Sequence, residues 1–456
     1  MIIQYYNKKA RAADTFCRAS LRKRIQAHMK VAICTLGCKV NQYETQALEQ
    51  ELKRRGHTLA DFEETADIYV VNTCSVTAVS DKKSRQMLRQ AKRRNPNAVI
   101  AACGCYAQTH PEDVKKLDLD VIAGTNDRTH FIDLLERAVR EKTHIVHVDD
   151  VWERREFEVL PAGGMVNRTR AMLKVEDGCV NFCTYCLIPY ARGRVRSLPL
   201  DEAARQVRAL REEGYREIVV TGIEISSYGS DFRDSTSLID LLERIAREGG
   251  EMRIRLGSLE PRTITEKFCA RAAKLKHLCP HFHLSMQSGC DATLKRMNRK
   301  YDTARFMESC ALLRKYFDDP AITTDLITGF PGETEEEFAQ TLDFIARVGF
   351  AEMHVFPYSI RPGTKAAEMP QVDMPVREER AARAAAIAKE MHEKYLARCV
   401  GKTFPVLFER DRQGGSAGHA PNYMEVSVAH EGLHNEVKNV KITAVDGGGL
   451  RGEVED

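Results

Sequence analysis

Hydrophobic and polar positions along the first third of the chain predict strands that alternate with helices. Val31–Leu36 is an apolar run typical of a buried strand, and Tyr43–Arg55 has helical periodicity up to Gly56. Further strands are predicted at 67–71, 98–102 and 120–123, and further helices at 81–94 and 129–141. This alternation predicts an N-terminal domain built on a parallel α/β sheet.

A second and longer α/β series begins near Met172. Its predicted strands are 171–176, 217–223, 253–257, 281–286, 321–327 and 352–358. The predicted helices between them are 200–213, 237–247, 263–275, 291–298, 302–316 and 334–347. A series of this length predicts a partial (β/α)6 barrel, which is shorter than the eight-fold form.

The pattern changes again after a charged helix at 376–398. Short alternating segments at 404–408, 423–428 and 437–444 predict a small all-β barrel that is suited to binding. The expected parts are a disordered basic extension (1–28), an N-terminal α/β domain (29–145), a linker (146–164), a central partial barrel (165–398) and a C-terminal β-domain (399–456). Because the extension has no clean periodicity, a start at Met29 is the alternative to a start at Met1.

The composition changes this picture little but indicates the cellular compartment. A chain of 456 residues is too long for one core, and its 43% hydrophobic and 29% charged residues are ordinary for a globular protein. No apolar run approaches the roughly 18 residues of a membrane helix, and no secretory signal is visible. With 14 cysteines, we expect a cytoplasmic monomer, without membrane contact, whose thiols serve metals or catalysis.

Cys179, Cys183 and Cys186 form the motif C-x3-C-x2-C. Thiols this close together are typical of metal ligands, and a loop of free thiols is the minor alternative. A closed structural zinc site needs four protein ligands, whereas three ligands leave one position for a substrate or cofactor. A [4Fe-4S] cluster held by three cysteines likewise keeps one iron open.

Cys38, Cys74 and Cys105 each follow a predicted strand of the first domain by a few residues. The carboxyl ends of parallel strands share one edge of a sheet, so we expect these thiols to converge into a second metal site. Three separately buried cysteines are the alternative, because burial is the commoner fate of a single cysteine. Cys103 lies just before Cys105 and leaves open which of the two is the ligand.

Basic residues gather beside both sets of cysteines, although the net charge of +4 is modest. Such clusters suit a phosphate backbone, and a plain solvated helix face is the alternative. The residues that we expect to contact nucleic acid lie on the helix at 81–94 and just after the cysteine motif: Lys82, Lys83, Arg85, Arg192, Arg194 and Arg196.

The cysteine motif, with Tyr185 before its last cysteine, resembles the signature of radical S-adenosylmethionine enzymes. From Met29 to its end, the chain resembles the methylthiotransferase family of these enzymes. This resemblance is carried by the two sets of cysteines and by Cys183-Thr-Tyr-Cys-Leu-Ile-Pro, Arg192-Gly193, Gln287-Ser-Gly289 and Gly329 to Thr334. Leu36-Gly-Cys-Lys-Val-Asn41 and Asn72-Thr-Cys74 resemble the branch that acts on threonylcarbamoyladenosine in tRNA.

The resemblance implies two [4Fe-4S] clusters. The C-x3-C-x2-C motif would hold the cluster that binds S-adenosylmethionine, and the trio Cys38, Cys74 and Cys105 would hold an auxiliary cluster that donates sulfur. The product would be 2-methylthio-N6-threonylcarbamoyladenosine beside the anticodon (position 37). The implied partners of the protein are tRNA and a one-electron donor such as flavodoxin or ferredoxin. The tRNA would be bound at its anticodon loop, and a C-terminal TRAM domain would contribute to this binding.

Polar residues after the predicted barrel strands are candidates for contacts to S-adenosylmethionine: Glu224, Ser258 and Gln287. Plain hydrogen bonds at the strand ends are the alternative. Gly257, Ser285 and Cys290 depart from the family's pattern at neighbouring positions.

Other functions remain open on the sequence. A sibling methylthiotransferase would act on isopentenyladenosine in tRNA or on an aspartate of a ribosomal protein. A non-catalytic iron–sulfur RNA-binding regulator or a zinc protein would need no radical chemistry.

Overall fold

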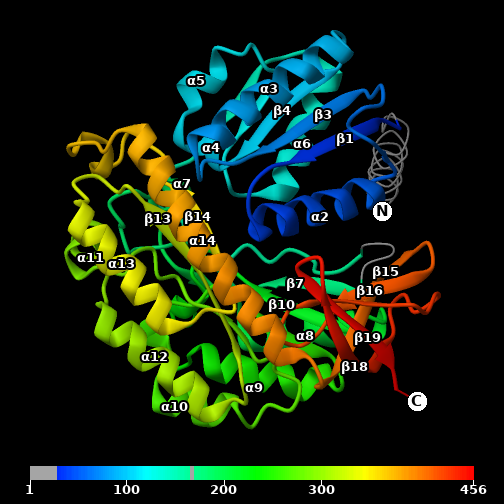
Figure 1. Cartoon of the computed structure of the whole chain (residues 1–456). Coiled ribbons are helices and arrows are strands. Elements are labelled where there is room, and N and C mark those ends of the chain that lie inside the picture. The colour runs from blue at the N-terminus through cyan, green and yellow to red at the C-terminus, as the bar shows by residue number, and fades with distance from the viewer. Residues whose placement is uncertain (1–27, 165–168, 456) are drawn as a thin grey trace, which may run out of the picture.

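The fold is taken from a computed structural model that describes residues 28–164 and 169–455. Residues 1–27 of the predicted basic extension lie outside the described residues. In Figure 1 the N-terminal domain stands at the top, the central α/β region fills the lower left, and the C-terminal barrel lies at the lower right.

The N-terminal domain is a six-stranded sheet in the order β2-β1-β3-β4-β5-β6, and every pair in it is parallel. Its strands are β1 (Lys30–Thr35), β2 (Thr58–Ala60), β3 (Ile68–Thr73), β4 (Val99–Gly104), β5 (Val121–Ala123) and β6 (Ile145–His147). Its helices are α2 (Lys39–Arg54), α3 (Ala78–Arg94), α4 (Cys105–Thr109), α5 (Pro111–Lys115) and α6 (Arg128–Glu141).

Alternating residues of these strands point to two separate hydrophobic cores. On β3, Tyr69 and Val71 pack with Leu88 of α3, whereas Ile68 and Val70 pack with the apolar faces of α2 and α6. The sheet is therefore covered by helices on both faces, which explains why its strands read as continuous apolar runs.

The central region consists of six parallel strands that follow one another in chain order. They form two three-stranded sheets, and parallel bridges from Ile254 to Leu278 and from Leu259 to Leu284 join these sheets into one open arc. The strands are β7 (Arg170–Lys174), β10 (Glu217–Thr221), β11 (Arg253–Leu256), β12 (His281–His283), β13 (Ala321–Thr328) and β14 (Glu352–Pro357). This arc is the predicted partial barrel.

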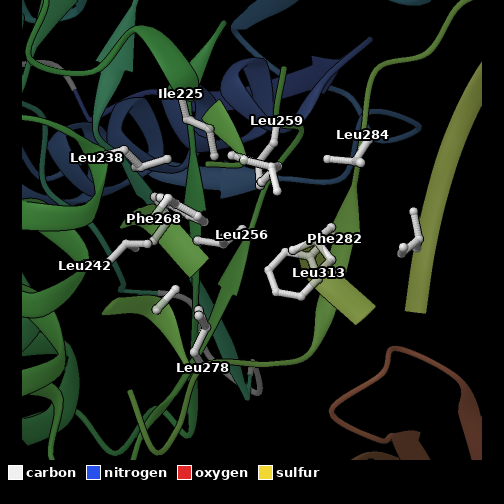
Figure 2. Close-up of a cluster of buried hydrophobic side chains, with 14 of the residues drawn as sticks. Ile225, Leu238, Leu242, Leu256, Leu259, Phe268, Leu278, Phe282, Leu284 and Leu313 are labelled. Atoms are coloured by element: carbon white, nitrogen blue, oxygen red, sulfur yellow. The ribbon is translucent and has the colours of Figure 1, made fainter. Parts of the chain in front are cut away.

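Helices cover the outside of the arc: α8 (Leu200–Glu212), α9 (Leu238–Gly249), α10 (Glu266–Ala272), α11 (Asp291–Arg296), α12 (Thr303–Tyr316), α13 (Glu335–Val348) and α14 (Met374–Cys399). Figure 2 shows how Leu242 and Phe268 from these helices meet Leu256 and Phe282 from the strands. Thr334 caps α13, and its side chain and that of Glu337 form a reciprocal capping box. The remaining short elements are β8 (Glu176–Asp177), α7 (Ile188–Arg192), β9 (Arg196–Ser197), η1 (Ile225–Ser227), η2 (Pro261–Thr263) and η3 (Lys365–Glu368).

The C-terminal domain is a closed five-stranded barrel in the order β15-β16-β17-β19-β18. Its strands are β15 (Thr403–Arg412), β16 (Gly415–His419), β17 (Glu425–Val428), β18 (Val437–Asp446) and β19 (Gly449–Val454). The predicted fold class is thus confirmed for all three domains. No described helix is long and apolar enough to span a membrane.

The C-terminal barrel packs against the amino-terminal end of the central arc. Arg255 of β11 donates to the backbone oxygens of Pro421 and Ala420, at 2.9 and 3.3 Å, and its guanidinium carbon lies 4.5 Å from the ring centre of Tyr423. Arg255 also pairs with Glu217 of β10, at 2.8 Å. The barrel thus contributes Tyr423 to the floor of the central domain.

Candidate metal centre

The thiols of Cys38, Cys74 and Cys105 meet at the carboxyl edge of the N-terminal sheet. Cys38 precedes α2, Cys74 directly follows β3, and Cys105 opens α4 after β4. Burial is the main cause that raises the pKa of Cys105 to about 12, and the charges of Cys38 and Cys74 raise it further. The structure therefore brings together three thiols that are far apart in the sequence.

Gly37 and two asparagines shape the segments that carry these cysteines. Gly37 has φ +96°, and a Cβ atom there would lie 2.5 Å from the Cys74 sulfur, so only glycine permits the close approach. The Asn41 amide donates to the backbone oxygens of Leu36 (2.8 Å) and Thr73 (3.1 Å) and ties the two loops together. The Asn72 amide donates to the Asn41 oxygen at 3.0 Å. The sequence motifs contained both asparagines, but their loop-tying role was not predicted.

Cys103 lies apart from this trio. It is buried on the opposite side of the sheet, in the core formed with Val31 of β1 and Phe131 of α6. Burial raises the pKa of its thiol to about 11. The structure therefore places Cys105, and not Cys103, beside Cys38 and Cys74.

The C-x3-C-x2-C motif forms a loop between β8 and α7. The Cys179 amide donates to the Gly193 oxygen, and the Cys186 amide donates to the Cys183 oxygen, both at 3.0 Å. Gly178 has φ +99°, and a Cβ atom there would lie 1.9 Å from the Arg194 oxygen. Burial is the main cause that raises the pKa of Cys186 to about 12, and the Cys183 charge raises it further. The loop thus gathers its three thiols in one half-buried space.

Arg299 donates a hydrogen bond directly to the sulfur of Cys183, at 3.2 Å. Its other amino group donates to the Ser285 oxygen at 3.0 Å, and its guanidinium lies 4.9 Å from the ring centre of Tyr301. These contacts fix the cation against the thiol. Sequence reasoning missed Arg299, because it lies far along the chain from the cysteine motif.

The two trios lie on adjoining elements. Helix α4, which starts at Cys105, packs against α7, which follows Cys186. The Thr125 hydroxyl donates to the Ala191 oxygen at 2.7 Å across the same junction. The Cys105 charge also contributes to the raised pKa of Cys186, behind burial and the Cys183 charge. The N-terminal sheet edge and the cysteine loop therefore lie next to each other.

A fully buried ion network joins the two domains behind the cysteines. Glu44 of α2 accepts from Arg192 (3.2 Å), Lys174 (3.0 Å) and Arg128 (2.6 Å). Burial alone would raise the pKa of Glu44, but the nearby cations, Arg128 first, hold it well below its usual value. Lys174 and Arg192 also contact Asp177, which lies just before the cysteine motif.

This network contradicts part of the expected nucleic-acid contact. Arg192 and Arg196 are almost completely buried and engaged with Glu44 and Asp177, so they are not available to a phosphate backbone. That expectation was wrong because the charge pattern alone cannot reveal a buried carboxylate partner. Arg194 is exposed, as are Lys82 and Lys83 on α3, while the half-buried Arg85 donates to the Tyr106 hydroxyl at 2.8 Å.

The polar residues expected to contact S-adenosylmethionine all follow the carboxyl ends of central strands. Glu224 is held near the cysteine loop, since Asn181 donates to its carboxylate at 3.2 Å, and burial raises the pKa of Glu224 to about 7. Gln287 is half-buried, has φ +68° and follows β12. Ser258 is exposed after β11.

Glu176 is a buried acid at the same rim that the sequence did not single out. One of its carboxylate oxygens accepts from the Glu224 amide at 2.6 Å, and the other has no hydrogen-bond partner among the described residues. Burial raises the pKa of Glu176 well above its usual value. An unpartnered buried oxygen beside the cysteine loop suits a polar ligand.

Comparisons with known proteins match this architecture. Residues 173–345 match the family described as the Radical SAM superfamily, and residues 30–124 match Uncharacterized protein family UPF0004. The fold is similar to that of the radical S-adenosylmethionine methyltransferase TsrM from Kitasatospora setae, with a TM-score of 0.57 and 14% identity over 75% of this chain and 77% of that chain. The fold and the cysteine motif together define a radical SAM enzyme.

Curated relatives narrow this class. The threonylcarbamoyladenosine tRNA methylthiotransferase MtaB of Bacillus subtilis is 41% identical over 90% of this chain and 93% of the relative. The protein of the same name from Aquifex aeolicus is 38% identical over 80% of this chain and 88% of the relative. The tRNA-2-methylthio-N(6)-dimethylallyladenosine synthase of Acetivibrio thermocellus is 34% identical over 88% of this chain and 85% of the relative. The chain belongs to the radical SAM methylthiotransferase family of enzymes.

The superfamily implies a [4Fe-4S] cluster and S-adenosylmethionine, and the residues of the C-x3-C-x2-C loop fit them. Cys179, Cys183 and Cys186 would hold the cluster through their thiolates. Within 28–164 and 169–455 no group of three or more His, Cys, Asp or Glu side chains closes around a single metal ion. The hydrogen bond from Arg299 to Cys183 also suits a sulfur that carries negative charge.

Proposed function

We propose that this enzyme adds a methylthio group to carbon 2 of N6-threonylcarbamoyladenosine at position 37 of tRNA. The observation that carries the proposal is the contact between α4, which starts at Cys105, and α7, which follows Cys186. A sulfur source and a radical source on adjoining walls suit a reaction in which one carbon atom exchanges hydrogen for sulfur.

In this proposal Cys38, Cys74 and Cys105 hold a second [4Fe-4S] cluster. Three converging thiols leave one iron without a protein ligand, as a sulfur-donating cluster requires. The loops of Cys38 and Cys74 are already tied together by Asn41, so the protein presents a preformed site.

The bound clusters and S-adenosylmethionine supply the electron, the hydrogen-abstracting group, the sulfur and the methyl group. The chain's own residues bind, orient and shield these groups. Arg299 holds the sulfur of Cys183, and the Glu44–Arg192 pair fixes one cysteine loop relative to the other. Glu224 and Gln287 lie where a bound S-adenosylmethionine would meet the strand ends, with Ser258 at the solvent side.

The tRNA would contact exposed cations around this space. Lys82 and Lys83 lie exposed on α3, and Arg194 lies exposed just after the cysteine loop. The C-terminal barrel presents further exposed cations, including Lys438 and Arg451, to the polynucleotide backbone.

The choice of substrate branch is supported by the names of the relatives. Five relatives named for threonylcarbamoyladenosine are between 31% and 41% identical to this chain, and three named for dimethylallyladenosine are each 34% identical. The difference is small, so the substrate is the part of the proposal that most needs an experiment.

The test is an anaerobic assay of the enzyme reconstituted with iron and sulfide. It receives reductant and S-adenosylmethionine, with tRNA that carries either threonylcarbamoyladenosine or isopentenyladenosine. We expect mass spectrometry of the nucleosides to reveal a methylthio adduct on the former only. An adduct on isopentenyladenosine alone, or an adduct on an aspartate when a ribosomal protein replaces the tRNA, would assign the sibling activity instead.

The same assay separates an enzyme from a regulator. A non-catalytic iron–sulfur protein would bind RNA but form no 5′-deoxyadenosine under reducing conditions. Cys183→Ala should abolish 5′-deoxyadenosine formation, whereas Cys74→Ala should retain it and lose the sulfur-containing product. A thiolated product from Cys74→Ala would remove the proposed role of the second cluster.

A further inference from the structure

Three aromatic side chains, the half-buried Trp152 and the exposed Phe182 and Tyr190, cluster beside the cysteine loop. The rings of Trp152 and Phe182 are nearly parallel, with an interplanar angle of 8° and centres 5.7 Å apart. The ring of Tyr190 meets Phe182 edge-on, with centres 6.0 Å apart. Phe182 is 40% exposed and Tyr190 48% exposed. We refer to Trp152, Phe182 and Tyr190 as the aromatic platform.

The platform is held in place at a conformational cost. Phe182 has φ +48°, in the left-handed region that a bulky side chain rarely adopts. The Asn298 amide donates to the Phe182 oxygen at 2.9 Å and to the Asn181 oxygen at 3.3 Å, which stabilises this backbone shape. This backbone strain holds the apolar Phe182 ring in solvent, where the ring does not stabilise a hydrophobic core. A strained backbone that exposes an aromatic ring points to a binding site.

Two cations lie against the platform. The Arg155 guanidinium donates to the Trp152 oxygen at 2.6 Å, and the Arg194 guanidinium lies 5.8 Å from the centre of the Trp152 ring. Both arginines are exposed, and neither forms a salt bridge among residues 28–164 and 169–455. Their charge therefore remains available to an anionic partner.

The position of the platform relates it to the metal centre. Phe182 directly precedes Cys183 within the motif, and Tyr190 belongs to α7, which packs against the helix of Cys105. Trp152 comes from the segment between the two α/β domains. A group that stacks here therefore lies next to the C-x3-C-x2-C loop and close to the helix that starts at Cys105.

We propose that the aromatic platform, with Arg155 and Arg194, binds an unpaired base of the RNA substrate next to the nucleotide that is modified. Unpaired bases in RNA loops stack on aromatic rings and on guanidinium planes, and their phosphates pair with arginine. A surface of aromatic rings and unpaired cations suits an RNA base and its phosphates better than it suits an apolar partner protein. The inference rests on the proposed function, because it takes tRNA as the substrate.

The first test measures affinity for a fluorescently labelled anticodon stem–loop RNA by anisotropy, using the reconstituted enzyme. Trp152→Ala and Tyr190→Ala should each weaken binding about tenfold, whereas Trp152→Phe, which retains an aromatic face, should bind nearly as wild type. Tyr316→Ala, on the outer helix α12, is the matched control and should leave binding unchanged. Circular dichroism and iron content verify that each variant is folded and loaded.

Salt separates stacking from charge. The loss caused by Trp152→Ala should persist at high salt, whereas the loss caused by Arg194→Ala should shrink. The chain contains a single tryptophan, so its emission reports directly on the platform and should change as RNA is added.

An abasic RNA series identifies the base. Removal of the base at the loop position that stacks on the platform should weaken RNA binding by the wild type. The same removal should not weaken RNA binding by Trp152→Ala any further. Equal affinities of wild type and both alanine variants for every RNA would overturn the platform while leaving the proposed function intact. Absence of any RNA binding by the wild type would overturn both. Slower reduction by flavodoxin with unchanged RNA affinity would instead make this surface a protein-docking site and would also overturn the inference.

Discussion

The guanidinium of Arg192 lies against the carboxylate of Glu44, and both side chains are completely buried. Glu44 belongs to the helix that follows Cys38, and Arg192 ends the helix that follows Cys186. This single ion pair therefore connects the supports of the two cysteine trios. Because Lys174 and Arg128 also contact Glu44, the carboxylate is the common anion of the junction.

Removal of this common anion should be strongly destabilising. Glu44→Ala removes the shared partner of three buried cations and leaves Asp177 as the carboxylate beside Lys174 and Arg192, and breaking a buried pair costs about 3–5 kcal/mol. Urea or thermal unfolding of the reconstituted enzyme measures the loss. The matched control is Glu202→Ala, which removes the exposed Arg205–Glu202 pair and should cost no more than about 1 kcal/mol. Equal losses in both variants would contradict the structural role of Glu44.

Glu217 should make the docking of the C-terminal barrel sensitive to acid. Burial alone would raise the pKa of Glu217, but Arg255, Arg253 and Arg170 outweigh it and lower the pKa to about 2. A lowered carboxyl pKa stabilises the fold above the unfolded value of 4.5, and this stability is lost as the pH falls from 4.5 towards 2. The contribution is about 3 kcal/mol.

Thermal unfolding between pH 7 and pH 3 checks this prediction against Glu217→Gln. The variant should be less stable than wild type at neutral pH, and the difference should narrow below about pH 4.5, because Glu217 is then protonated in the unfolded wild-type chain but still charged in the folded one. A constant difference across the pH range would show that the carboxylate charge does not hold the two domains together.

Alanine variants of Cys105 and Cys103 should differ in the iron content of the reconstituted protein. Cys105→Ala should lower the reconstituted iron from about eight to about four per chain, because one cluster loses a ligand. Cys103→Ala removes a thiol that packs in the core and should keep about eight. Iron and sulfide analysis, with the absorbance of the clusters, distinguishes the two. Normal iron in the Cys105 variant would make Cys103 the ligand.

Arg299 should raise the reduction potential of the cluster held by Cys183. A hydrogen bond to a ligating sulfur stabilises the more negative, reduced state. A hydrogen bond that is about 1 kcal/mol stronger in the reduced state than in the oxidised state corresponds to about 40 mV. Arg299→Met should therefore lower the midpoint potential by about 40 mV. Redox titration followed by electron paramagnetic resonance measures the shift, and Arg299→Lys should fall between the two. An unchanged potential would assign Arg299 to packing alone.

The parts of the fold that follow hydrophobic periodicity could be predicted from the sequence. The long strands of both α/β domains and the helices between them lie close to their expected positions. Strands β2 and β6 were missed because each is only three residues long and exposed at a sheet edge. Strands β16 and β19 were missed because their glycines weaken the apolar pattern while allowing the tight packing of a small barrel.

The positions of the six cysteines could be predicted because their spacing and their placement after strands are local features, and their role as metal ligands remains a prediction. The environment of the ligands could not. Whether an arginine faces solvent or a buried carboxylate depends on contacts between residues far apart in the chain, as the Arg192–Glu44 pair illustrates. For the same reason Arg299, remote from the cysteine motif in sequence, was not anticipated.

The Tyr423 ring of the C-terminal domain lies against Arg255 and Arg170 of the central domain, and this contact affects how the C-terminal domain can be studied. The C-terminal barrel packs against the central domain, and in the proposed function it also binds tRNA. A chain that ends after residue 400 would lose this packing and leave Arg255 without two of its backbone acceptors. The proposed tRNA binding is therefore better tested by substituting outward-facing cations of the barrel, such as Arg451, one at a time.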